Sequence, residues 1–262
     1  MFPDLFAGMG DLPRLLLSAV FVLIAAAISR WQQADLERDL AIATVRSFIQ
    51  LIFIGYALEL IFTQNNPIFT TGILLIMVTI AGRTSGARVK NLPAAQRIGI
   101  ISIAVGTFLT ISLLLILGVF EFIPQDVIPI GGMIVGTAMS VATLVMTRLY
   151  DDFHAQSLEI ETKLALGASS RESSSTQFKR SIRAAMIPII DTTKTVGLIK
   201  LPGAMTGMIL AGASPLKAVQ LQIIVMYMLV GASTFTGLIA AYLTYQQFFT
   251  ADHQILSFRQ TG

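Results

Sequence analysis

Long apolar runs separated by short polar segments follow one another along almost the whole chain. A helix needs about 20 predominantly apolar residues to cross the roughly 30 Å hydrocarbon core of a bilayer. Seven segments approach or exceed this length, at residues 12–29, 40–62, 67–81, 98–120, 127–147, 184–212 and 218–242. The pattern predicts an all-α, polytopic integral membrane protein with about seven transmembrane helices.

The sixth segment, residues 184–212, is too long for a simple span, since it would extend about 43 Å as one α-helix. Pro202 and Gly203 are expected to divide it into an interfacial part and a membrane part, because proline interrupts helical hydrogen bonding. Asp191 and Lys194 lie three residues apart on the interfacial part, within reach of an ion pair. Such a pair is either structural or, with the Pro-Gly break, part of a gate or coupling joint.

The cations of the chain indicate its orientation. Lys and Arg are concentrated in the connections after the first, third and fifth segments, whereas those after the second, fourth and sixth contain only Lys217. The positive-inside rule therefore places the N-terminus outside and the C-terminus in the cytoplasm. Residues 148–184 then form a cytoplasmic insert within a single transmembrane domain that covers residues 1–262.

This insert has the pattern of two helices joined by a tight turn. Four apolar residues form one stripe at helical spacing, opposite a charged face: Leu149, Phe153, Ile160 and Leu164. Gly167 is placed to end the first helix, because glycine adopts the left-handed C-terminal conformation without a side-chain clash. Ser169 and Glu172 have the spacing of a capping box for the second helix. The insert is either a solvated loop or a docking element for a partner.

The composition of the chain limits the kinds of function that it can have. The chain is 54% hydrophobic and 13% charged, too apolar for an average soluble domain. Its basic residues fall in short connections between apolar runs, which indicates topology signals and no nucleic-acid partner. Cysteine is absent, His154 and His253 lie far from any membrane carboxylate, and there is no GxxxxGK[ST] phosphate loop. We therefore expect no enzymatic activity and no cofactor on this chain.

Three polar residues lie within the second apolar segment: Arg46, Gln50 and Glu59. Polar side chains at membrane depth usually face the protein interior or a solvated path. Glu59 is thus a candidate to bind a cation in transit, and the alternative is an interfacial carboxylate hydrated by lipid headgroups. Arg46 lies near the cytoplasmic end and can extend its guanidinium to the interface. We take the three as a candidate substrate path, with any metal ligands left unassigned.

Two stretches resemble a known family. They are EIETKLALGAS, residues 159–169, and the string IPxxDxxKxxGLxxLPGxMxGxILxG, residues 187–212. Both are similar to motifs of the UPF0014 family, whose members include a bacterial iron-export permease and a plant ABC-transporter subunit linked to aluminium tolerance. The first stretch also resembles, more loosely, the EAA loop by which ABC importer permeases dock on their ATPase. Glu161 and Gly167 match its Glu and Gly, whereas Thr162 and Lys163 replace its two alanines.

The resemblance implies the permease subunit of an ABC transporter in the cell (inner or plasma) membrane. It implies a homodimer with a separate ATPase subunit that carries the ATP and Mg. The ATPase-coupling residues would be Glu161, Gly167, Ala168 and Ser169. The implied substrate is iron or a related metal, which is exported, or alternatively a nucleotide sugar. A self-sufficient ion-coupled carrier or channel is an alternative of a different class, with Asp191, Lys194 and Glu59 on its ion path.

Overall fold

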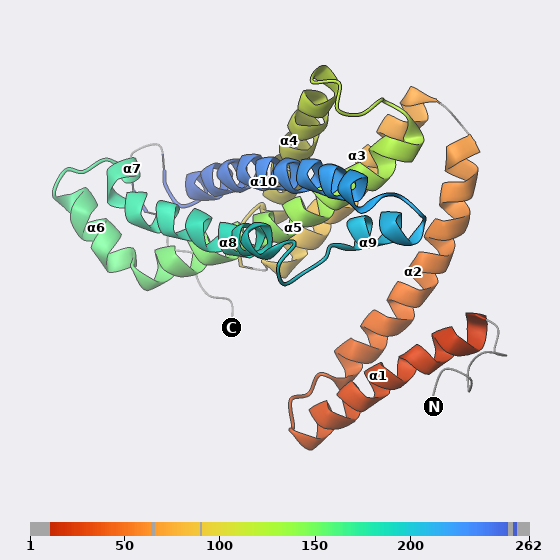
Figure 1. Cartoon of the computed structure of the whole chain (residues 1–262). Coiled ribbons are helices and arrows are strands. Elements are labelled where there is room, and N and C mark those ends of the chain that lie inside the picture. Colours follow the sequence, from red (N-terminus) through yellow and green to blue (C-terminus); the bar gives the residue numbers. More distant parts are fainter. Residues whose placement is uncertain (1–10, 64–65, 90, 251–253, 256–262) are drawn as a thin grey trace. The chain divides into compact units, whose positions relative to one another are not determined.

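The computed structural model describes residues 11–63, 66–89, 91–250 and 254–255, and these ranges are predominantly helical (Figure 1). The helices are α1 (Asp11–Trp31), α2 (Glu37–Thr63), α3 (Pro67–Arg88), α4 (Ala95–Ile116), α5 (Pro124–Ala155), α6 (Ser157–Ala165), α7 (Ser170–Ser173), α8 (Ser175–Thr195), α9 (Gly203–Leu210) and α10 (Pro215–Gln246). Within the described ranges, β pairing is limited to two isolated bridges. The all-α prediction is confirmed.

Several of these helices have the length and apolarity to cross a membrane. In the described part of the chain five qualify, namely α2, α3, α4, α5 and α10, and α1 adds a shorter apolar stretch, Leu17–Trp31. A polytopic membrane protein is therefore confirmed. The sixth predicted span differs, because α9 has eight residues and is only about 12 Å long. It is too short to cross a bilayer by itself.

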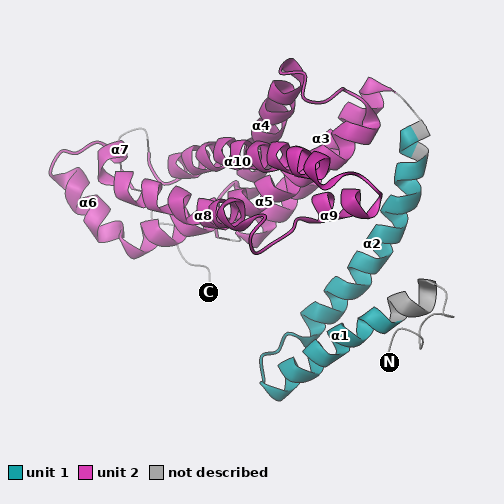
Figure 2. Ribbon diagram, in the orientation of Figure 1, with its two compact units in different colours: residues 1–64 teal, residues 65–262 magenta. Residues whose placement is uncertain are grey.

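The chain forms two compact units, Met1–Gln64 and Asn65–Gly262 (Figure 2). In the first unit α1 packs against α2. In the second, α5 is the central helix and contacts α3, α4, α8 and α10. The prediction of one domain over residues 1–262 stays a prediction.

Helix α5 is central because one of its faces is completely buried. The residues on this face are apolar and often small. The fully buried members are Ile134, Ala138, Ala142, Val145, Met146 and Leu149. Small side chains let neighbouring helices approach closely, which is the main source of helix association in lipid. The long predicted span at residues 127–147 thus becomes the core of the second unit.

Helices α3 and α4 form a tightly packed hairpin. A Cβ atom on Gly82 would overlap the backbone of Ile100, and one on Gly86 would overlap the backbone of Gln96. The two helices are therefore in backbone contact where α3 ends and α4 begins. Larger residues at either glycine would push the hairpin apart.

Helices α5 and α10 run in the same direction. Their C-terminal ends meet where the rings of Phe153 and Phe248 pack edge to face, with centroids 4.6 Å apart. Their first halves share a second core cluster, which includes Ile134 and Met228. Because the two helices are parallel, the chain between them must return from the end of one to the start of the other. Helices α8 and α9 share this return, in agreement with the predicted division of residues 184–212.

The predicted orientation leads to a test with reporter fusions that are active on only one side of the membrane. A reporter after Asn66 should read outside, and one after Ser174 should read inside, because the cations cluster on the side of the insert. A reporter after Gln247 should read the same side as Ser174, because α5 and α10 end together. Opposite readings at Ser174 and Gln247 would contradict the parallel arrangement.

Candidate functional site

The candidate site is the elbow, which we define as Gly167, Ala168 and Ser169, together with the helices on either side of it. Helix α5 does not continue into α6 as the sequence pattern predicted, because Gln156 leaves helical geometry at φ −119° and ψ 23°. The predicted apolar stripe is nevertheless confirmed. Phe153 and Ile160 are buried, and Leu164 packs partly buried against the same core.

Gly167 ends α6 as predicted. Its φ is +91°, in the left-handed region that favours glycine. The Gly167 amide donates to the carbonyl of Leu164 at 2.9 Å, and the Ala168 amide donates to that of Lys163 at 3.1 Å. These bonds satisfy carbonyls that the end of a helix leaves free. No atom lies within 4 Å of a Cβ built at Gly167, so the constraint here is the backbone conformation alone.

The predicted capping box is also confirmed. The Ser169 hydroxyl accepts from the Glu172 amide at 3.3 Å, and the Glu172 carboxylate accepts from the Ser169 amide at 2.9 Å. The hydroxyl of Ser169 also donates to this carboxylate, and this hydrogen bond is the largest cause that lowers the pKa of Glu172. A carboxylate with a lowered pKa stays ionised at neutral pH, so the box persists there. Helix α7, which it starts, is short, and α8 follows directly.

Helix α8 joins the elbow to the core of the second unit. The Gln177 side chain donates to Gln156 at 2.7 Å, and the Ser181 hydroxyl donates to Asp152 at 3.2 Å. Both bonds connect the first turns of α8 to the end of α5. Helix α8 also packs along α10. Helix α8 thus connects the elbow to two long core helices, α5 and α10.

The outer face of α6 carries two exposed leucines. Leu158 is 77% exposed and Leu166 is 83% exposed, and the exposed Glu161 and Thr162 lie between them. We call these four residues the α6 face. The sequence interpretation missed both leucines because it followed only the stripe that faces the core. Their spacing of eight residues, around Thr162, was the available signal.

Asp191 and Lys194 do not form the ion pair that their spacing allowed. Among the described residues the one ion pair is Lys163 with Glu159, at 2.6 Å. Both Asp191 and Lys194 are exposed near the end of α8. A structural ion pair is therefore wrong for this structure, and a role in a gate or coupling joint stays a prediction.

The break in this segment is confirmed and begins earlier than predicted. Helix α8 ends at Thr195, and the chain turns through Gly197, whose φ is +84°. Pro202 then caps α9, which starts at Gly203. Helices α8 and α9 are thus separated by a turn of several residues.

The three polar residues of α2 do not all lie on one face of this helix. Arg46, Gln50 and Glu59 are all exposed on this helix. At about 100° per residue, Arg46 and Gln50 share a face, whereas Glu59 lies about 180° away from Gln50. Within the described residues, no three His, Asp or Glu side chains gather to hold a metal ion. The substrate path stays a prediction.

Comparison with known proteins identifies the family. The family model described as "Uncharacterised protein family (UPF0014)" matches residues 12–249. The UPF0014 membrane protein STAR2 of Oryza sativa subsp. japonica is 46% identical over 234 residues, which cover 89% of this chain and 82% of that protein. The "Probable iron export permease protein FetB" of Escherichia coli (strain K12) is 38% identical over 242 residues, which cover 92% of this chain and 93% of that protein.

A further relative is the Protein ALUMINUM SENSITIVE 3 of Arabidopsis thaliana, 45% identical over 236 residues, 90% of this chain and 86% of that protein. No solved structure matches this chain. The family match extends from α1 to the end of α10 and includes the elbow and the break before α9. The chain belongs to the UPF0014 family of membrane proteins.

Proposed function

We propose that this chain is the membrane-spanning permease subunit of an ABC transporter, that it exports iron or a related metal, and that a separate ATPase subunit drives it. The α6 face carries the proposal. It presents Leu158 and Leu166 to solvent on a segment that is not a candidate span. Exposed apolar patches outside a membrane mark interaction sites. The relative named as a probable iron export permease supports the substrate class.

The elbow lies beyond the hydrocarbon in this proposal. Helix α5 has 32 residues and is about 48 Å long, well over the roughly 30 Å of a bilayer core. Its C-terminal turns, and α6 and α7 after them, project from the membrane on the side that the cations assign to the cytoplasm. A cytoplasmic ATPase meets the permease there.

The contacts of α8 supply the coupling. The ATPase subunits move when they bind and hydrolyse ATP, and this motion displaces the elbow. Gln177 and Ser181 transmit it to the end of α5, and packing transmits it to α10. Packed helices change between discrete arrangements and do not deform continuously, so the displacement switches the bundle. Nucleotide chemistry stays on the partner, since this chain has no phosphate loop.

The α6 face also defines the partner's chemistry. Two leucines suit an apolar groove on the ATPase, and Glu161 between them suits a cationic residue at its rim. The apolar contacts supply affinity and the charge sets the register.

A second copy of the chain completes the transport unit. Gly136 and Ser140 are exposed on α5, four residues apart, although most of this helix is buried. Nothing lies within 4 Å of a Cβ built at Gly136. Small residues at this spacing let two helices approach closely in lipid, which supports the expected homodimer.

A self-sufficient carrier or channel has less support. That mechanism requires charged groups gathered along an ion path. In the described residues Asp191 and Lys194 are exposed and unpaired, and Glu59 lies on the face of α2 opposite Gln50. The elbow, in contrast, is fully formed.

The first prediction tests the backbone of the elbow. Replacing Gly167 by Leu puts a side chain where a left-handed backbone is needed, which costs about 1–2 kcal/mol and displaces Ser169. Co-purification of the ATPase should be lost. Gly167→Asn is the matched control, because asparagine tolerates this conformation, and it should keep the partner. Wild-type binding by Gly167→Leu would refute docking through the elbow.

The second prediction tests the α6 face. Leu158→Asp or Leu166→Asp should lower the affinity for the ATPase roughly tenfold or more, because each removes an apolar anchor. Thermal stability should change little, since both side chains are exposed. Arg180→Asp, an exposed position on α8, is the control. Equal losses at Arg180 and Leu166 would indicate a general charge effect and not a docking face.

The third prediction concerns the substrate. Cells that lack the gene should accumulate iron under iron load, and the wild-type gene should restore the iron content. The Leu166→Asp variant should fail to restore it, because export depends on the ATPase. The measurement is elemental analysis of washed cells. An unchanged content of every metal would contradict metal export.

A further inference from the structure

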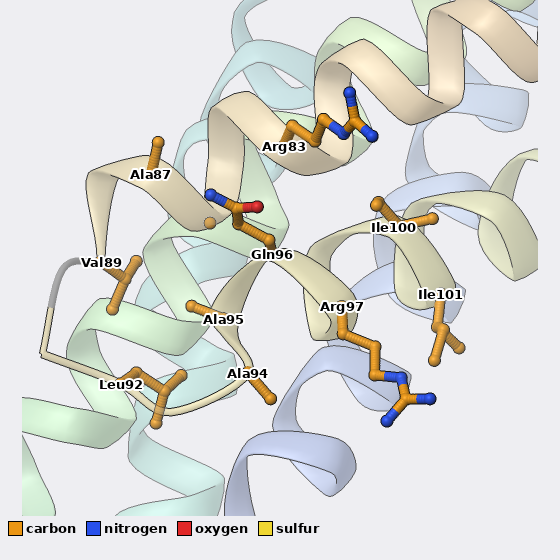
Figure 3. A pocket seen from close by; sticks show the side chains of 11 residues that line it. Arg83, Ala87, Val89, Leu92, Ala94, Ala95, Gln96, Arg97, Ile100 and Ile101 are labelled. Atoms are coloured by element: carbon orange, nitrogen blue, oxygen red, sulfur yellow. The ribbon is translucent and has the colours of Figure 1, made fainter.

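A groove of about 810 Å³ opens where α3 ends and α4 begins (Figure 3). Its polar lining consists of Arg83 from α3 and of Gln96 and Arg97 from the first turn of α4, all exposed. Its apolar lining includes Ile100 and Ile101, further along α4. The groove thus combines a cationic part, formed by Arg83 and Arg97, with an apolar part that also includes Val89 and Leu92 at the turn.

The positive charge of this groove is not neutralised within its own segment. No Asp or Glu occurs between Glu59 and Glu121, whereas this stretch contains Arg83, Arg88, Lys90 and Arg97. Lys90 lies outside the described residues. Of the other three, none takes part in an ion pair, since the one pair in the described ranges lies on α6. An anionic ligand would supply the missing counter-charge.

The backbone adds to this field. The residue before α4, Ala94, has a φ of 55° and provides no side-chain cap for the helix. The Ala95 amide donates to the carbonyl of Leu92 at 3.3 Å, and the Gln96 and Arg97 amides after it lie at the positive end of the helix dipole. The groove is also pre-formed, because Gly86 is in backbone contact with Gln96.

The position of the groove restricts what occupies it. Helices α3 and α4 are both candidate spans, so the turn between them lies at a membrane surface. Ile100 and Ile101 lie one turn after Arg97 along α4, and Ile100 packs against Gly82, next to Arg83 on α3. A ligand with a negative head and an apolar tail matches both parts, whereas a soluble anion matches only the first.

We propose that this groove binds one anionic phospholipid of the cytoplasmic leaflet. Its phosphate contacts Arg83 and Arg97, and an acyl chain lies along Ile100 and Ile101. Basic pockets between helices at a membrane surface hold such headgroups. A zwitterionic lipid is disfavoured, because its ammonium group would face cations and no acid. The bound lipid fixes the α3–α4 hairpin relative to the membrane surface.

The test is native mass spectrometry of the detergent-purified full chain, titrated with dioleoyl-phosphatidylglycerol or dioleoyl-phosphatidylcholine. Wild type should prefer the anionic lipid. In the double variant Arg83→Gln with Arg97→Gln this preference should fall roughly tenfold. The double variant Arg148→Gln with Arg180→Gln, which removes two exposed cations elsewhere, should keep it. Arg97→Lys should also keep most of it, since the charge remains.

Three outcomes would overturn the proposal. One is an unchanged lipid preference in the Arg83 and Arg97 double variant. Another is competition by glycerol phosphate or inorganic phosphate at the same concentration as the lipid, which would assign the groove to a soluble anion. The third is a double variant that keeps the lipid and loses the ATPase, which would make the groove a protein-docking surface. If the double variant does not fold, Arg97→Gln alone gives the same reading with a smaller loss.

Discussion

The parallel packing of α5 and α10 is the constraint on which the second unit depends. Helix α5 buries a face of small and branched side chains, and its end is fixed to the end of α10 by Phe153 and Phe248. Two parallel neighbours cannot be joined by a short turn. The chain must leave the bundle and come back, and α6, α7, α8 and α9 are that excursion. The elbow exists on this detour because the core helices run the same way.

Local signals in the sequence predicted the features that depend on a few adjacent residues. The apolar runs predicted the spans, because a helix that crosses a bilayer must be long and apolar. Gly167, Ser169 and Glu172 predicted the elbow, because helix caps depend on residues within one turn. The break at Gln156 had no such signal, since glutamine is compatible with a helix interior. The predicted ion pair between Asp191 and Lys194 does not form, because a spacing of three residues on a helix permits a contact without requiring one.

The candidate site was less predictable because it depends on which surfaces stay uncovered. The buried stripe of the insert was clear, yet Leu158 and Leu166 looked like ordinary apolar residues until the fold left them outside. The groove between Arg83 and Arg97 was difficult to predict for the same reason. Its cations were visible as a topology signal, and their arrangement beside an uncapped helix start and an apolar wall required the packed α3–α4 hairpin.

The open surroundings of Gly167 separate two properties that a glycine usually combines, small size and freedom of handedness. With no atom within 4 Å of a Cβ built there, size is irrelevant, and only the mirror-image backbone region matters. A D-alanine introduced by chemical synthesis favours this region and leaves the unfolded chain fewer conformations, so it would stabilise the turn by about 0.4–1 kcal/mol. The elbow thus depends on one α-carbon that lacks the L side chain which would disfavour the left-handed region.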